Sequence, residues 1–119
     1  MSRSILLQLA RDSIQEVLQA QRSIDKSALV LKHPLLNEKI LTTINIYLGG
    51  ELRGSSTSTN SDKTLLEDII YNAKKSAFED KDFTPITTSD YLSCEVEILL
   101  KTPDGVISEK DPAILKERN

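Results

Sequence analysis

The chain has 119 residues, of which 39% are hydrophobic and 28% charged, and its formal net charge at pH 7 is -3. This length fits one compact domain, and this composition allows a buried core and argues against wholesale disorder. Lysines and arginines are scattered through the acidic chain, which argues against nucleic acid as a partner, because phosphate contacts need clustered basic side chains.

Residues 4–21 begin the chain with apolar side chains at helical spacing, which predicts an amphipathic helix. Its polar residues, Arg11 among them, are expected on the solvent face. Residues 22–39 contain a short apolar patch that ends at His33 and Pro34. Because a proline disfavours helix at the residue before it, this segment is predicted to be an irregular arm or a short strand.

Residues 40–48 alternate between two faces and form the clearest predicted strand. Two glycines, Gly49 and Gly50, then allow a tight turn into a second strand at 51–57. A loop or bulge that absorbs Glu51 would set Leu48 opposite Leu52 and Ile46 opposite Gly54. We favour that register because the apolar faces of the two strands then agree.

The second half of the chain continues the same pattern. A helix is predicted at residues 64–78, where Thr64 and Glu67 fit a capping box. We further expect one helical turn at 87–90, a strand at 93–101, a turn at 102–105 and a short strand at 106–107. A last helical segment is expected from Asp111 to the end of the chain, and residues 109–119 are expected to form a mobile tail. Together these elements predict an α+β fold, with a mainly antiparallel sheet and its glycine-turned hairpin packed against two amphipathic helices.

Signals for export, membranes and metals are missing from the sequence. The N-terminal apolar run covers only residues 5–7, which is too short for a membrane span or a secretory signal. The single cysteine, Cys94, cannot form an internal disulfide and is expected to be a buried thiol. We therefore expect a cytoplasmic protein without membrane contact, metal or other cofactor.

Three stretches, in this order, resemble the AMMECR-type domain, protein A of the AmmeMemoRadiSam system. They are Leu-Arg-Gly at 52–54, Ala-Phe-Glu-Asp-Lys-Asp-Phe-Thr-Pro at 77–85 and Cys-Glu-Val-Glu-Ile at 94–98. The resemblance covers most of the chain and implies a single AMMECR-like domain over residues 1–119. Family members usually continue further, so the chain looks like a short form with the first half of the usual fold. Where the family usually has cysteine after Leu-Arg-Gly, this chain has Ser55.

Two classes of function fit this resemblance. The first is a non-catalytic binding or accessory module that works beside the Memo and radical-SAM partners that the resemblance implies. The alternative is an enzyme that acts on a small substrate near Arg53, Ser55 and Thr57. A serine without a neighbouring base is a poor nucleophile, which favours binding. The expected site has no catalytic residue and no metal ligand, and its binding residues are Arg53, Gly54, Ser55, Ser56, Thr57 and Asp80.

Several of these residues also have structural interpretations, which the sequence leaves open. The hydroxyl side chains at 55–59 could line a pocket for a small anion or simply form a polar strand and loop. Arg53 could bind a substrate or form a salt bridge with Glu95 or Glu97. The carboxylates at 79–82 could hold a divalent cation, or Asp80 could cap the following turn.

An open sheet leaves backbone groups unpaired at its edges. We therefore expect a homodimer or a protein partner that completes the sheet.

Overall fold

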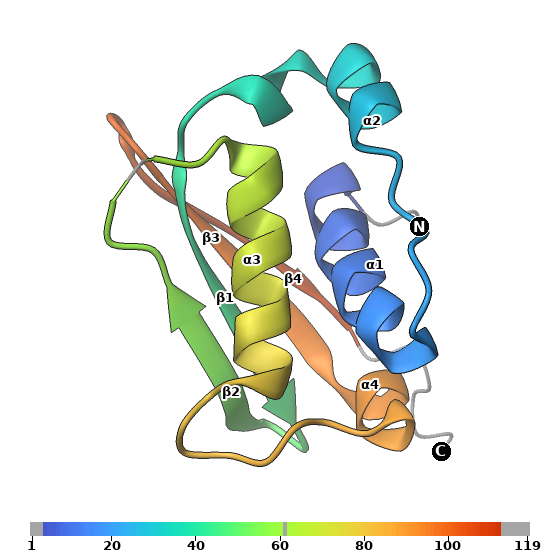
Figure 1. The fold of residues 1–119 in the computed structure, drawn as a ribbon. Helices are drawn as coiled ribbons and strands as arrows, with labels where there is room; N and C mark the ends of the chain where they lie inside the picture. The colour runs from blue at the N-terminus through green and yellow to red at the C-terminus, as the bar shows by residue number, and fades with distance from the viewer. Residues whose placement is uncertain (1–3, 61, 113–119) are drawn as a thin grey trace.

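The computed structural model describes residues 4–60 and 62–112 and has the predicted α+β fold (Figure 1). One antiparallel sheet has the strand order β2-β1-β3-β4. In chain order the elements are α1 (Ile5–Gln19), α2 (Lys26–Lys32), the 3-10 helix η1 (Pro34–Asn37), β1 (Leu41–Leu48), β2 (Glu51–Thr57), α3 (Leu65–Phe78), α4 (Thr88–Ser93), β3 (Glu95–Thr102) and β4 (Gly105–Asp111). The predicted helices at 4–21 and 64–78 and the strands at 40–48, 51–57 and 93–101 are confirmed, within one to two residues at their ends.

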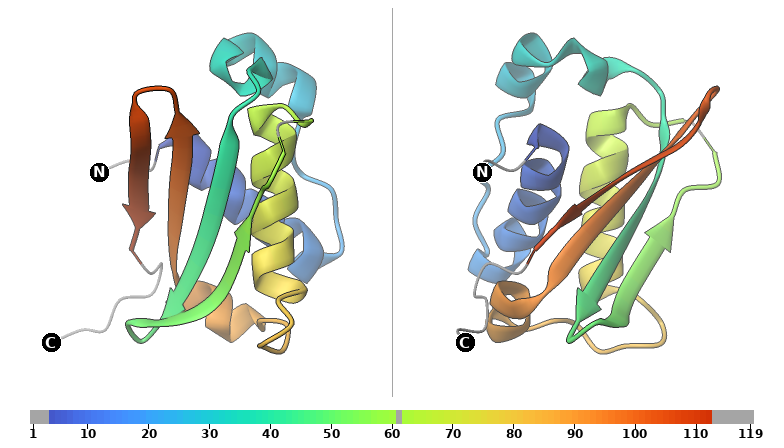
Figure 2. Two further views of the ribbon diagram at one scale, coloured as in Figure 1. Left: turned by 90° about the vertical axis from the view of Figure 1, so that its left-hand side faces the viewer. Right: turned by 180° about the vertical axis from the view of Figure 1, so that it is seen from behind.

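The sheet and the helices form two layers (Figure 2). Helices α1 and α3 lie side by side on one face of the sheet, and in residues 4–60 and 62–112 no helix or strand covers the other face. Alternate residues of β1 and β3 turn toward the helices, because successive side chains of a strand point to opposite faces. The buried core accordingly combines Ile44, Ile46, Val96 and Ile98 of the sheet with Leu9, Ala10, Ile14, Leu65, Ile69 and Ala73 of the two helices.

Helix α3 begins at a cap that only half matches the prediction. Thr64 accepts a hydrogen bond from the amide of Glu67, as a capping residue should. The carboxylate of Glu67 contacts Lys26 Nζ at 3.1 Å. The complete capping box occurs at α4, where the Thr87 hydroxyl and the Asp90 carboxylate each accept a backbone amide.

The segment 22–39 is more helical than predicted. Asp25 caps α2 by accepting a hydrogen bond from the amide of Ala28, and α2 ends at Lys32, before His33 and Pro34. Pro34 then opens η1, where a proline without an amide hydrogen is tolerated. The prediction of an irregular arm or short strand was wrong. Pro34 disfavours helix only at the residue before it, so one helix can end just before that residue and another can begin at the proline itself.

At the end of the chain, the predicted strand at 106–107 is confirmed, but it is longer than predicted. Residues 106–107 belong to a seven-residue strand, β4, which pairs with β3 from Gly105 to Asp111. Residues 109–111 are therefore the end of this strand and not part of a mobile tail. Ser4 donates a hydrogen bond to Glu109 at 2.7 Å, which ties β4 to the start of α1. The rest of the predicted helix and tail, residues 113–119, lies outside the described residues.

Arg11 departs furthest from the prediction. It was expected on the wet face of the first helix, and it is completely buried between α1, the end of α4 and the end of β4. Its guanidinium group contacts Asp111 at 2.5 Å and the carbonyl oxygen of Cys94 at 2.8 Å. This ion pair connects residues one hundred positions apart and fixes the last strand to the first helix.

Within the described part of the chain, no helix is both long and apolar enough to cross a membrane.

Candidate functional site

The β1–β2 hairpin turns through Gly49 and Gly50, whose φ angles are +63° and +83°. Such left-handed angles suit glycine and close a two-residue loop, so Leu48 lies opposite Glu51. The predicted pairing of Leu48 with Leu52 is therefore wrong, while that of Ile46 with Gly54 is confirmed. The extra residue sits further along β2, where the register shifts between Ile46 and Tyr47.

The register shift leaves Arg53 without a partner residue in β1 and directs its side chain to the segment after α3. Its Nη2 donates to the carbonyl oxygen of Thr84 at 2.8 Å and lies 3.9 Å from an oxygen of Asp90. The guanidinium group also lies over the ring of Phe83, 5.3 Å from the centroid. The other nitrogen, Nη1, is buried without a hydrogen-bond partner among the described residues.

The two proposed salt-bridge partners of Arg53 are used elsewhere. Glu95 pairs with Lys110 at 3.5 Å, and Glu97 accepts hydrogen bonds from Asn45 and Tyr47. The predicted cross-strand salt bridge to Glu95 or Glu97 is therefore wrong. Since the register shift turns Arg53 out of the regular alternation, a prediction based on alternation alone could not place its side chain.

Gly54 lies where α3 packs directly onto the backbone of β2. A Cβ atom at this position would stand 2.1 Å from the carbonyl oxygen of Ser76 in α3. The helix can approach the strand this closely only because position 54 has no side chain. Gly54 is buried and is not available to a ligand.

Ser55 lies on the uncovered face of the sheet and belongs to a chain of side-chain hydrogen bonds. Its hydroxyl donates to Asn45 Oδ1 at 2.7 Å, and Asn45 Nδ2 donates to Glu97 at 3.0 Å. The hydroxyl of Tyr47 donates to the same oxygen of Glu97 at 2.9 Å. This hydrogen bond, together with partial burial, raises the pKa of Tyr47. The polar groups around Ser55 thus already bond one another.

Asp80 caps the turn after α3, as predicted, and also protects the edge of the sheet. One carboxylate oxygen accepts the amide of Asp82 at 2.8 Å, and the other accepts the amide of Ser55 at 2.9 Å. The latter amide points away from β1 at the free edge of β2, where an unpaired strand would otherwise invite pairing. Across residues 4–60 and 62–112, no three acidic, histidine or cysteine side chains are grouped so that they could hold a metal ion.

Two adjoining grooves follow the free edge of β2. The larger has a volume of about 430 Å³ and is lined by Ser55, Ser56, Thr57, Lys75, Glu79, Asp80, Lys81 and Asp82. The smaller has a volume of about 160 Å³ and shares Ser56, Thr57 and Lys75 with it. Of the predicted binding residues, Ser55, Ser56, Thr57 and Asp80 therefore lie along one groove. Arg53 and Gly54 are not among its lining residues.

A buried polar cluster under β2 was not predicted. The carboxylate of Asp68 accepts hydrogen bonds from the amide and hydroxyl of Thr42 at 2.9 and 2.7 Å, and Asn72 accepts the hydroxyl of Ser56 at 2.7 Å. Ser58 donates to the other oxygen of Asp68 and accepts from Asn72. This cluster orients the end of β2 against α3, because each buried polar group has a partner.

Cys94 is completely buried, as predicted. Burial raises the pKa of its thiol, although the neighbouring Arg11 guanidinium opposes the shift. A thiol that is buried and protonated at neutral pH is a poor nucleophile, so Cys94 contributes to packing.

Comparisons with known proteins identify a family and related solved structures. The family model described as AMMECR1 matches residues 7–115. The crystal structure of an uncharacterized protein from Pyrococcus horikoshii is similar to this chain, with a TM-score of 0.71 and 28% sequence identity. The similarity covers 82% of this chain and 50% of that chain, so this chain spans about half the length of that protein. No curated protein matches the sequence.

Proposed function

Since this chain belongs to the AMMECR1 family, whose biochemical function is unclear, we propose that it is a non-catalytic binding module. Its contact surface is the outer edge of β2 with the neighbouring residues 79–82, where the larger groove lies. Because residues 52–54 and 77–85 carry the family resemblance and flank this groove, they are the natural place for a binding surface. The resemblance also suggests Memo and radical-SAM proteins as the associates of this module.

The observation that carries the proposal is the hydrogen bond from the Ser55 hydroxyl to the amide oxygen of Asn45. An amide oxygen is too weak a base to take the hydroxyl proton, so Ser55 is not activated for attack. The single histidine of the chain, His33, lies between α2 and η1 and is not part of this network. Cys94 is buried. The described residues thus offer no activated nucleophile at the groove.

An enzyme that acts on a small substrate at Arg53, Ser55 and Thr57 is the second candidate. It is favoured by Nη1 of Arg53, which has no hydrogen-bond partner among the described residues, because buried donors usually have partners and an anionic substrate would supply one. The geometry favours binding over catalysis, because an arginine alone can orient a substrate but supplies neither a base nor a nucleophile.

The two candidates differ in the reactivity of Ser55. We expect a fluorophosphonate probe, which labels activated serines, to leave Ser55 unmodified under conditions that label trypsin stoichiometrically. Mass spectrometry of the digested protein measures the labelling, and Ser55→Ala serves as the control for modification at other hydroxyls. Stoichiometric labelling that disappears in Ser55→Ala would overturn the binding proposal and support a hydrolase.

The exposed edge of β4 supports a further part of the proposal, which is self-association. Val106 and Ile107 on this edge strand are 59% and 54% exposed, and the outer backbone groups of β4 have no neighbouring strand among the described residues. An edge strand with exposed apolar residues is a ready pairing surface. A symmetric dimer would let this surface cover its own copy.

Size exclusion coupled to light scattering, at micromolar concentration, tests this association. We expect twice the monomer mass of 13.3 kDa for the unmodified chain and the monomer mass for Val106→Lys, because a lysine on an edge strand opposes pairing. Lys32→Gln, an exposed change on α2 and away from β4, is the control and should remain dimeric. A chain that elutes at 13.3 kDa at every concentration would exclude the dimer and leave a different protein as the partner.

A further inference from the structure

We infer that the smaller groove, at the end of β2 beside α3, binds a single phosphate group. The inference rests on the proposed binding function and names a ligand class for one end of its surface. The groove has a volume of about 160 Å³, and its lining includes Thr57, Thr59, Asn60, Lys63 and Lys75. Each of these residues contributes a hydroxyl, amide or ammonium donor, which is the chemistry that recognises an oxyanion.

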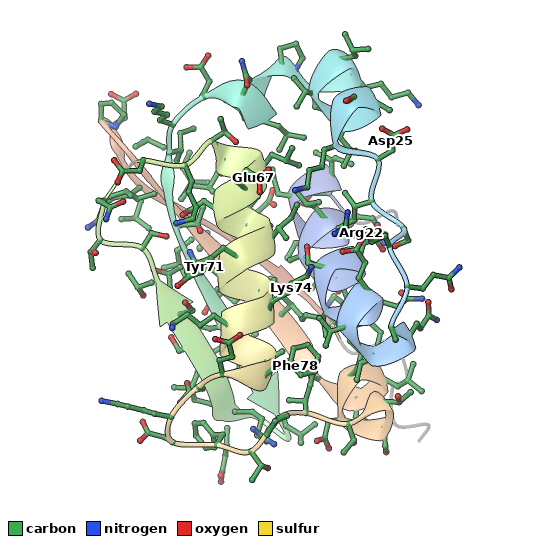
Figure 3. The ribbon with its side chains drawn as sticks, in the orientation of Figure 1. Arg22, Asp25, Glu67, Tyr71, Lys74 and Phe78 are labelled. Carbon is green, nitrogen blue, oxygen red and sulfur yellow. The ribbon has the colours of Figure 1, made fainter. Side chains whose placement is uncertain are left out.

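Two lysines make this groove locally positive in a chain of net charge -3. Lys63 Nζ lies 4.5 Å and Lys75 Nζ 5.8 Å from the centroid of the Tyr71 ring, so one ring holds both ammonium groups at the same groove. Tyr71 itself lies on the β2 side of α3, whereas Lys74 lies on the side that faces α1 (Figure 3).

Among residues 4–60 and 62–112, neither lysine forms an ion pair. In the described part of the chain, no carboxylate lies within 4.0 Å of Lys63 or Lys75. The neighbouring Lys74, by contrast, pairs with Glu16 at 3.2 Å. Because the two cations are held together without a counter-charge, an anion that enters the groove gains attraction from both.

The strand adds a backbone donor to the lysines. The amide of Ser55 points away from β1 and is bonded by Asp80. Amides two residues apart on a strand point the same way, so the amide of Thr57 also points outward at this edge. No described residue accepts it. Thr57 thus supplies a backbone N–H beside the lysines, and oxyanions are commonly held by such amides.

The size and surroundings of the groove restrict the ligand to one phosphate group. Its volume is far below that of a nucleotide pocket. The adjoining larger groove is lined by Glu79, Asp80 and Asp82, whose carboxylates would repel the next phosphate of an extended polyanion. The site therefore fits inorganic phosphate or the phosphate of a small monoester better than RNA or DNA.

The test is a titration of the full chain with inorganic phosphate, followed by amide NMR shifts at constant ionic strength. We expect saturable shifts at residues 57–60, 63 and 75. The double variant Lys63→Gln/Lys75→Gln should bind at least tenfold more weakly, because both cations are lost. Lys74→Gln, which removes one positive charge from the helix that carries Lys75, should bind within twofold of the unmodified chain. Glycerol 3-phosphate, titrated in parallel, separates a monoester site from a site for the free ion.

The outcomes are distinct from those of the other tests. Shifts that do not saturate, or that are spread equally over all lysines and persist in the double variant, would overturn the phosphate site. That result would not change the results expected for Ser55 labelling or for the dimer, so the proposed binding module would stand without this ligand. Circular dichroism of each variant verifies folding, and if the double variant does not fold, the location of the shifts in the unmodified chain decides.

Discussion

Replacing Arg11 by methionine is expected to lower the free energy of unfolding by about 3–5 kcal/mol, the range for removal of one partner of a buried ion pair. This is a large part of the stability of a small domain, which is about 5–15 kcal/mol in total. Urea denaturation followed by circular dichroism measures the change. The expectation follows from the environment of Arg11, whose side chain is 1% exposed while that of Asp111 is 5% exposed.

The loss arises mainly from the groups that Arg11 leaves behind. Asp111 would remain buried, with its ion-pair partner removed. The carbonyl oxygens of Tyr91, Cys94 and Pro112 would each lose a donor, because Nη1 and Nη2 now bond them at 3.1, 2.8 and 3.0 Å. Methionine fills a similar volume but donates no hydrogen bond. The variant thus separates the electrostatic role of Arg11 from its packing.

A second variant distinguishes a buried ion pair from a general sensitivity of α1. In Arg11→Met/Asp111→Leu no charge remains buried at the pair, so we expect part of the lost stability to return. Arg22→Met is the matched control at an exposed arginine and should change stability by less than about 0.5 kcal/mol. A double variant as unstable as the sum of its single changes would contradict the ion-pair explanation.

The parts of the fold that could be predicted are those set by local periodicity. In β1, Thr42, Ile44 and Ile46 turn toward the helices as expected, because strand alternation fixes the face of each residue. The stripe of α3 through Ile69 and Ala73 is buried for the equivalent helical reason. The place of the glycine turn and the Thr64 cap were predictable because they depend on residues close in sequence, although the hairpin register and the Glu67 half of the capping box were not.

The buried polar residues could not be predicted in the same way. Arg11 lies four residues after Leu7 and three before Ile14, both buried, so its position on the helix already pointed inward. An arginine is buried only with a partner, and that partner, Asp111, lies one hundred residues away on β4. Asp68 and Asn72 likewise share one face of α3 at a spacing of four residues. Their partners on β1 and β2 become evident only once the sheet is assembled.

Prediction of the candidate site was limited in the same way, because its residues are distant in the sequence. The groove residues Ser55, Ser56 and Thr57 were predicted because they adjoin Leu-Arg-Gly in the sequence. Lys63 and Lys75 belong to the same edge of the molecule but follow later in the chain, one before α3 and one within it. A signal for them existed in the helical spacing of Tyr71 and Lys75, which places both on one face of α3. Nothing in the sequence indicated that this face meets the end of β2.

The second large effect on stability is expected at Gly54, the glycine of Leu-Arg-Gly. Gly54→Ala is expected to lower the free energy of unfolding by about 3 kcal/mol or more, at or above the upper part of the range for overpacked cores. The added Cβ would lie 2.1 Å from the carbonyl oxygen of Ser76, and this oxygen belongs to the backbone. No rotamer change can relieve the contact, so α3 must move away from β2 or the strand must bend. Urea denaturation gives the size of the loss.

Two comparisons test whether the close approach of α3 to β2 causes this loss of stability. Gly50→Ala meets nothing within 4 Å but requires a residue at a φ of +83°, so it should cost only about 1–2 kcal/mol. Adding Ser76→Ala to Gly54→Ala should restore nothing, since the contact is with the main chain of Ser76 and not its side chain. Rescue by Ser76→Ala, or a loss no larger than that of Gly50→Ala, would show that the helix can yield at this point. Either result would show that packing against α3 does not require glycine at position 54.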